Sequence, residues 1–336
     1  MSEIDSYLKN NDSLLYTYRI TPDIKRIAEK YGFLDYMVER YLEFLGEGTE
    51  DFLSSCSVPL TKSIRCNSLK IDCGKLEKRL TDKGFSLKRI EWSRFGYRVE
   101  KVPPRPTLGA TVEYMKGFYY IQGEASMIPP EVLSPKEGEL VLDMASSPGG
   151  KTTHMAQLMN NRGTIVALEK NPARLRKIRS NISRLGVSNV VLLWMGGEDV
   201  PKLGIEFDKI LLDAPCSGEG LIPLDPSRKT KTKPEDLKNF QRTQLTLLAS
   251  GFKVLKRGGY MVYSTCSIAP EEDEVIVDFA VKYLGMRVEK IQGIPGERGL
   301  TSFKGLSFSP ELTQCLRIYP HLQHMEGFFV CLLRKE

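Results

Sequence analysis

The sequence has little histidine and no closely spaced pair of cysteines. Its 336 residues include three histidines, and no two of its seven cysteines form a C-x-x-C motif. We therefore expect no metal ion in the protein. The odd number and irregular spacing of the cysteines also argue against a disulfide framework and favour a reducing compartment. These cysteines are Cys56, Cys66, Cys73, Cys216, Cys266, Cys315 and Cys331.

Long apolar runs are missing as well. No run approaches the roughly 18 residues that a helix needs to cross a bilayer. The first twenty residues carry no apolar core of the kind found in signal peptides. Both absences argue against a membrane partner. We expect a cytoplasmic protein, and we expect it to act as a monomer.

The chain has an ordinary globular composition but an uneven distribution of charge. Hydrophobic residues make up 41% of it and charged residues 27%, with a net charge of +6. Residues 1–60 carry 6 Lys and Arg against 11 Asp and Glu, whereas residues 61–110 carry 13 against 5. A basic block that also contains Trp92, Phe95 and Tyr97 is typical of a surface that binds a polyanion. The solvated face of a small domain would explain these charges equally well.

A run of prolines divides the chain. Residues 103–106 (PPRP) cannot form regular structure, and the length of the chain favours two domains. We predict a small N-terminal α+β domain over residues 1–110 and a larger domain over residues 111–336. Apolar residues at helical spacing predict helix between Pro22 and Leu45, with Gly32 as a point of division.

The larger domain alternates apolar strands with helices. This order favours a doubly wound, mostly parallel seven-stranded sheet of the α/β class, with a hairpin-like edge formed by the last two strands. A helix over residues 271–284 is expected to hold Glu271, Glu272 and Asp273 in its first turn, near the positive end of the helix dipole. The predicted strands are 139–145, 164–169, 189–194, 208–213, 259–264, 286–291 and 327–333, and the other helices are 151–160, 172–185 and 234–256.

A glycine-rich turn follows the first strand of this sheet, at residues 145–151 (ASSPGGK). Such a turn at the start of a helix offers unpaired N–H groups to a ligand. The Walker A pattern matches only in part: Gly150-Lys151-Thr152 agree, but Ala145 stands where its first glycine belongs, so a P-loop is the less favoured alternative. The dinucleotide fingerprint G-x-G-x-x-G is absent. S-adenosylmethionine remains, because Glu169 ends the next strand and could bind ribose hydroxyls. Asp199, or Glu198 in the alternative register, could bind the adenine.

Two strand ends each present a cysteine. Asp213-Ala-Pro-Cys216 follows one predicted strand, and Thr265-Cys266-Ser267 follows another about fifty residues later. The carboxyl ends of parallel strands are where ligands bind in open α/β sheets. A cysteine taken alone is usually a small buried hydrophobe, but two at matched strand ends, one beside a carboxylate, favour chemistry.

The motifs together resemble those of the Sun/Fmu family of RNA (cytosine-5)-methyltransferases, and in particular archaeal-type tRNA enzymes. The resemblance covers about residues 60–336 and implies a class I methyltransferase (Rossmann-like) fold, S-adenosyl-L-methionine as cofactor and RNA as partner. The matching stretches are Asp143 to Thr152, Asp213 to Gly218 and Ser264 to Ser267, supported by 65–67 (RCN), 120–126 (YIQGEAS), 270–274 (PEEDE) and 327–329 (GFF).

The resemblance also implies roles for four residues. Carbon 5 of cytosine is a poor nucleophile until a thiolate adds at carbon 6, and a thiol combines good attack with good departure. By similarity to the family, Cys266 is that nucleophile and Cys216 assists release. Asp213 would hold the N3/N4 edge of the base. Lys151 could favour the thiolate; an exposed residue of the first helical turn is the less favoured alternative.

The remaining candidates bind the cofactor or the RNA. Basic residues after the Cys216 motif could contact phosphates or form a solvated connection, and a polar strand of the small domain could face the RNA. The predicted RNA-binding residues are Arg65, Asn67, Arg228, Lys229, Lys231 and Lys233. The predicted cofactor-binding residues are Ala145, Ser146, Ser147, Pro148, Gly149, Gly150, Lys151, Glu169, Arg174, Asp199 and Asp213.

The substrate that the resemblance implies is tRNA, as for compact members of the family, with rRNA as the alternative for the same chemistry. Methylation of an amino group through the Asp213 motif would leave Cys266 without a role. A non-catalytic RNA-binding assembly factor is disfavoured because both cysteines and the glycine turn are intact.

Overall fold

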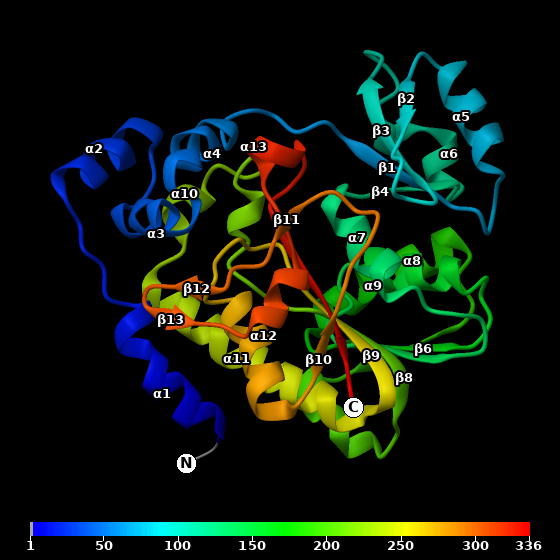
Figure 1. Ribbon diagram of the computed structural model, residues 1–336. Coiled ribbons are helices and arrows are strands. Elements are labelled where there is room, and N and C mark those ends of the chain that lie inside the picture. The colour runs from blue at the N-terminus through cyan, green and yellow to red at the C-terminus, as the bar shows by residue number, and fades with distance from the viewer. Residues whose placement is uncertain (1–2) are drawn as a thin grey trace.

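A parallel sheet of five strands forms the centre of the larger domain in the computed structural model, which describes residues 3–336 (Figure 1). The strands lie in the order β7-β6-β5-β8-β9, and every neighbouring pair is parallel. Acidic residues end three of them at one edge of the sheet, where a ligand is expected. The strands are β5 (Leu140–Asp143), β6 (Thr164–Glu169), β7 (Val190–Trp194), β8 (Phe207–Asp213) and β9 (Leu255–Thr265).

Antiparallel strands extend this sheet beyond β9. β15 (Phe328–Arg334) pairs with β9, and the other edge of β15 pairs with both β10 (Arg287–Glu289) and β14 (Leu316–Ile318). β11 (Glu297–Arg298) adds to β14, giving nine strands. All seven predicted strands are present, which confirms the doubly wound, mostly parallel sheet. β11 and β14 were not predicted, because two or three residues carry no readable alternation. A separate hairpin joins β12 (Ser302–Phe303) to β13 (Leu306–Ser307).

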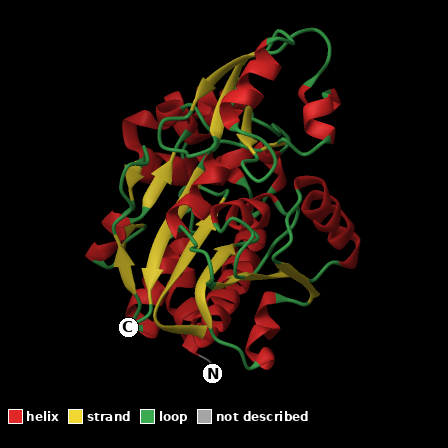
Figure 2. Cartoon of the chain, turned by 90° about the vertical axis from the view of Figure 1, so that its right-hand side faces the viewer, coloured by secondary structure: helices red, strands yellow, loops and turns green. Residues whose placement is uncertain are grey.

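Helices cover both faces of the sheet, as Figure 2 shows. Neighbouring residues of one strand point to opposite faces, so Val141 packs in one apolar cluster and Leu142 in the other. The Val141 side is covered by α7 (Ile128–Leu133), α8 (Gly150–Leu158) and α9 (Pro172–Leu185); the Leu142 side is covered by α11 (Pro234–Val254) and α12 (Glu274–Leu284).

The small domain is a four-stranded antiparallel sheet in the order β2-β3-β1-β4, at the upper right of Figure 1. Its last strand lies beyond the predicted boundary at residue 110, because Ile121 pairs with Ile64. The domain therefore ends after β4 and not at the proline run. Its elements are β1 (Ser63–Cys66), α5 (Cys73–Thr81), β2 (Ser86–Arg89), β3 (Gly96–Lys101), α6 (Val112–Met115) and β4 (Tyr119–Ile121).

Residues 3–60 do not belong to this small domain, contrary to the predicted division. They form four helices that lie on the opposite side of the molecule in Figure 1. The Tyr7 hydroxyl donates to the carbonyl of Val275 (2.8 Å), and the next three helices share an apolar cluster with Leu237 and Ile268 of the larger domain. Gly32, in the left-handed region at φ 73°, divides two of them as predicted. The helices are α1 (Glu3–Leu15), α2 (Pro22–Tyr31), α3 (Asp35–Leu45) and α4 (Thr49–Ser55).

Two sequence-based expectations about local structure are wrong. α12 begins at Glu274, and the three acids before it lie in a buried turn instead of the first turn of the helix. Disulfides join Cys66 to Cys73 and Cys315 to Cys331. Their spacing of 7 and 16 residues gave no signal, because the fold alone brings these residues together.

Neither a membrane span nor a metal cluster is found among residues 3–336. No helix there is both long and apolar enough to cross a bilayer. No group of three or more His, Cys, Asp or Glu residues in that range is arranged to hold a metal ion.

Candidate active site

Two cysteines meet at the carboxyl ends of β8 and β9. The strands are parallel neighbours with Asp213 opposite Ser264, so the segments that follow them emerge side by side. The sulfur atoms of Cys216 and Cys266 are 3.2 Å apart, and both side chains line a cavity of about 230 Å³. The fold therefore brings together the two residues that the sequence placed fifty positions apart.

An ion pair stands beside the cysteines. Lys151 Nζ lies 2.7 Å from Asp213 Oδ2, and the Ser264 hydroxyl donates to Oδ1 of the same carboxylate at 2.8 Å. Burial alone would lower the pKa of the Lys151 ammonium, but Asp213 and the nearby Cys266 outweigh burial and raise it. Lys151 is thus a half-buried cation at the site, with 15% of its side chain exposed, and not an exposed helix residue. Ser264 was not among the predicted site residues, although it lies in a quoted motif.

The two thiols are not equivalent. The hydrogen bond with Cys266, followed by burial, raises the pKa of the Cys216 thiol well above its usual range. Cys216 is therefore protonated at neutral pH and can donate its S–H to the sulfur of Cys266. A thiolate at Cys266 also benefits from the positive charge of Lys151.

The glycine-rich turn lies between this cavity and a second one of about 230 Å³. Gly149, in the left-handed region at φ 98°, caps the start of α8, and a Cβ on Gly150 would lie 3.0 Å from the ring of Tyr120. The turn can pass so close to the small domain only with glycine there. Ala145 and Ser147 line both cavities; Ser146, Pro148, Gly150 and Lys151 line the second, and Gly149 lines neither.

Two carboxylates besides Asp213 line the first cavity. Glu169, at the end of β6, and Glu198 both line it, together with Arg174. Asp199 does not, because its side chain points to the surface and pairs with Lys202 at 2.6 Å. Of the two acids considered for the adenine, the structure thus places Glu198, and not Asp199, at the cavity. Apolar walls from Met144, Leu168 and Leu247 complete a site suited to an aromatic base with polar substituents.

The predicted RNA-binding residues divide into two groups. Arg65 and Asn67 are buried at 1% and 2% exposure, so their expected place on an RNA-facing surface is wrong. Arg65 donates to the Gly150 carbonyl (2.8 Å) and Asn67 to the Leu185 carbonyl (2.8 Å), so both join the small domain to the larger one. The sequence could not show this burial, because a run of four strand residues is too short to reveal which face of the strand is covered.

The basic run after the Cys216 segment is partly helical, as α10 (Arg228–Lys231), and not only a loop. Arg228 lines the first cavity and donates to the Ser217 carbonyl at 2.8 Å. Lys229 bonds to the carbonyl of Tyr31 (3.0 Å). Lys231 and Lys233 are exposed.

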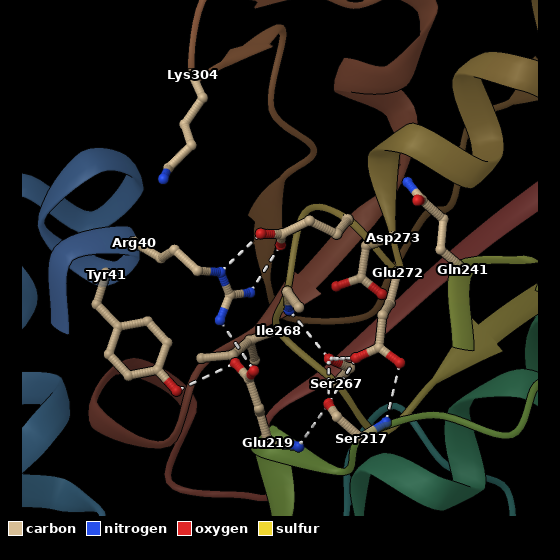
Figure 3. A network of polar contacts seen from close by, with 12 residues as sticks. Arg40, Tyr41, Ser217, Glu219, Gln241, Ser267, Ile268, Glu272, Asp273 and Lys304 are labelled. Carbon is tan, nitrogen blue, oxygen red and sulfur yellow. Dashed lines mark hydrogen bonds and ion pairs between the residues drawn. The ribbon is translucent and has the colours of Figure 1, made fainter. Parts of the chain in front are cut away.

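A buried ion-pair cluster lies behind the cysteine segments (Figure 3). Arg40 of α3 donates from Nε and Nη2 to both oxygens of Glu271 at 2.7 Å, and from Nη1 to Glu219 at 3.0 Å. Tyr41 donates to the other oxygen of Glu219 at 3.1 Å. Glu219 lies three residues after Cys216. The N-terminal helices are therefore attached directly to the segment that carries this cysteine.

Comparison with known families agrees with this geometry. The family described as 16S rRNA methyltransferase RsmB/F matches residues 130–334, and the N-terminal domain of 16S rRNA methyltransferase RsmF matches residues 35–124. The chain belongs to the RsmB/F family. The second match extends through β4, in agreement with the sheet that includes this strand.

Similar proteins include enzymes named for rRNA and for tRNA. The chain is 39% identical to the 28S rRNA (cytosine-C(5))-methyltransferase of Mus musculus, over 93% of this chain and 40% of that protein. It is also 39% identical to the tRNA (cytosine(72)-C(5))-methyltransferase of Pyrococcus horikoshii, over 75% of this chain and 63% of that protein. The chain spans about half or less of the length of its mouse, human, nematode and fission-yeast relatives.

Solved structures of RsmB/F-like proteins share the fold. A methyltransferase homologue from Pyrococcus horikoshii superposes with a TM-score of 0.86 at 39% identity, over 94% of this chain and all of that one. NSun6 from the same organism, with SFG, gives 0.78 at 28% identity over 93% of this chain and 98% of that one. The class I methyltransferase fold expected from the sequence is confirmed.

Proposed function

We propose that the protein transfers a methyl group from S-adenosylmethionine to carbon 5 of cytosine in RNA, through a covalent bond between Cys266 and carbon 6. The pair of sulfur atoms 3.2 Å apart carries this proposal. Methylation of an amino group needs no nucleophilic thiol, whereas addition to carbon 6 and later release need one thiol for attack and a second group to accept a proton.

The first cavity fits the cofactor. Its apolar walls suit an adenine ring, and Glu169 and Glu198 supply carboxylates for ribose and adenine hydrogen bonds. Glu169 is already held in place, since its Oε1 accepts the N–H of Asn171 at 2.7 Å. When bound, the cofactor would supply an electrophilic methyl group. Both cysteines line the same cavity.

The chain's own residues then account for attack and release. Lys151 favours the Cys266 thiolate, which adds to carbon 6, while Asp213 holds the polar edge of the base. Once its sulfur is bonded to carbon, Cys266 no longer raises the pKa of the Cys216 thiol through the hydrogen bond between them or as a charged neighbour. Cys216 then gives its proton to solvent water. Its thiolate accepts the proton from carbon 5. The electrons of that C–H bond form the carbon 5–carbon 6 double bond and expel the Cys266 thiolate.

The RNA partner follows from the family, and the choice of RNA stays a proposal. An rRNA relative and a tRNA relative match at the same identity, 39%. Our sequence-based preference for tRNA therefore remains a prediction. Duplex stacking hides carbon 5, so the target must be unpaired or flipped out. Supplying purified tRNA and rRNA separately, and measuring methyl incorporation into each, decides between them.

Glu169→Ala should weaken S-adenosylmethionine binding by roughly 1–3 kcal/mol, because ribose hydroxyls lose a charged acceptor. Titration calorimetry measures the affinity directly. Asp199→Ala is the control, since it also removes one carboxylate, but this one lies outside the cavity and pairs with Lys202. Equal affinities for both variants would remove Glu169 from the cofactor site.

Neutralising exposed lysines of the small domain should weaken RNA binding and reduce its dependence on salt. The slope of log K against log salt should fall by about 0.7–0.9 for each lysine that contacts a phosphate. Fluorescence anisotropy at several salt concentrations measures it for the triple change of Lys75, Lys78 and Lys88 to Gln. The same change at Lys9, Lys25 and Lys253, exposed lysines outside the small domain, removes equal charge as a control. Equal slopes for both triple variants would make the basic block a solvated face.

A further inference from the structure

A serine follows each cysteine, and both serines bond to one buried carboxylate. The hydroxyls of Ser217 and Ser267 are 3.2 Å apart, and they donate to Oε2 of Glu272 at 2.5 and 2.6 Å. Glu272 lies in the turn before α12, at 0% exposure (Figure 3). One carboxylate oxygen therefore bridges the two segments that carry the candidate catalytic thiols.

The second oxygen of Glu272 binds only the Cys216 side. Oε1 accepts the backbone N–H of Ser217 at 2.9 Å and the side-chain amide of Gln244 at 3.0 Å. The Gln244 amide also donates to the Pro215 carbonyl at 3.0 Å. The carboxylate thus contacts Ser217 twice directly and reaches Pro215 through Gln244, so it holds the residues on both sides of Cys216.

Cys266 depends much less on this carboxylate. It directly follows β9, whose Thr265 is paired with Phe329 of β15, and its carbonyl accepts the N–H of Gly220 at 3.0 Å. A paired strand end is held by the sheet. Cys216 lies in an irregular segment beyond the last residue of β8, where side-chain contacts must do this instead.

We propose that Glu272 is a positioning residue that holds Cys216 within hydrogen-bond distance of Cys266. Glu272 therefore supports release of the methylated base more than the attack of Cys266 on that base. This inference rests on the proposed covalent mechanism. Glu272 touches neither thiol and acts through Ser217, Ser267 and Gln244. Four donated hydrogen bonds favour its ionised form, whereas burial raises the pKa of its carboxyl to about 7. The test below is therefore run at pH 8.

The test compares Glu272→Gln with Cys216→Ala, using S-adenosylmethionine and an RNA that the wild-type protein methylates. A glutamine of the same size keeps one acceptor oxygen and turns an N–H₂ group toward donors, so the Cys216 segment loses part of its support. Covalent RNA complex should still form and survive denaturing electrophoresis. Its decay should be roughly ten- to hundredfold slower than in the wild type, the effect expected when hydrogen bonds to a charged group are lost.

Two further variants separate positioning from general damage. Glu274→Gln makes the same change at a buried carboxylate of the same run, but Glu274 binds Arg317 and the N–H of Leu300, not the cysteine segments. It should not accumulate the complex. Ser217→Ala keeps the Glu272 carboxylate and should slow decay of the covalent RNA complex more than Ser267→Ala does. These two serine variants still test the proposal if Glu272→Gln fails to fold.

Each outcome decides the inference. If folded Glu272→Gln protein neither forms the complex nor makes product, the role of Glu272 is purely structural. If it releases RNA at the wild-type rate, Glu272 has no role in release. Either result overturns the proposal. If Cys216→Ala traps RNA in the same experiment, the covalent mechanism survives that failure. If Cys216→Ala traps none, the mechanism and the role of Glu272 fall together.

Discussion

Cys266→Ala should make no methylated RNA and no covalent complex, whereas Cys216→Ala should accumulate a complex that survives denaturing electrophoresis. The reason is the order of the two steps. Without the Cys266 sulfur no bond to carbon 6 can form. Without the Cys216 sulfur the bond forms, but the proton on carbon 5 lacks its acceptor, and the RNA stays attached. The complex should need S-adenosylmethionine to reach full yield, because only the methylated base waits for release.

Cys56→Ala is the matched control for this pair. Cys56 is a free, buried thiol in the cluster of N-terminal helices, and burial raises the pKa of its thiol to about 12. It should keep the wild-type rate and trap nothing. The double variant lacking both active-site cysteines should trap nothing either. Trapping by Cys266→Ala and not by Cys216→Ala would reverse the two roles.

Arg40→Met should lower the free energy of unfolding by about 3–5 kcal/mol, the usual cost of removing one partner from a buried ion pair. The change leaves Glu219 and Glu271 as buried carboxylates without their cation. Urea unfolding at neutral pH measures the loss. Lys30→Met breaks an exposed pair with Glu50 and should cost less than about 1 kcal/mol. Equal losses for the two variants would contradict the importance assigned to the buried cluster.

The central sheet and the cysteine pair were predictable from sequence because their signals are local. A buried parallel strand is a short apolar run such as residues 209–212 (KILL), and the residues after it must form a turn at the carboxyl edge of the sheet. β6 and α9 have the bounds that the sequence predicts. The small strands β11 and β14 are too short to carry such a signal.

The missed features depend on contacts between distant segments. Glu271, Glu272 and Asp273 read as a favourable first helical turn, yet each is buried because Arg40, Ser217 and Thr265 come from elsewhere in the chain to bind them. Arg65 read as a surface residue because an arginine is rarely buried without a partner, and its partners lie 57 to 88 residues away. The helices of residues 3–60 likewise carry no sign of which domain they cover.

The most direct test of the proposed activity is the chemical identity of the methylated nucleoside. Purified protein is incubated with RNA and S-adenosylmethionine that carries an isotopically labelled methyl group, and the digested RNA is separated and analysed by mass spectrometry. We predict labelled 5-methylcytidine with the wild-type protein and none with Cys266→Ala. Label on the exocyclic amine of cytidine, or the same 5-methylcytidine yield from Cys266→Ala, would contradict the account.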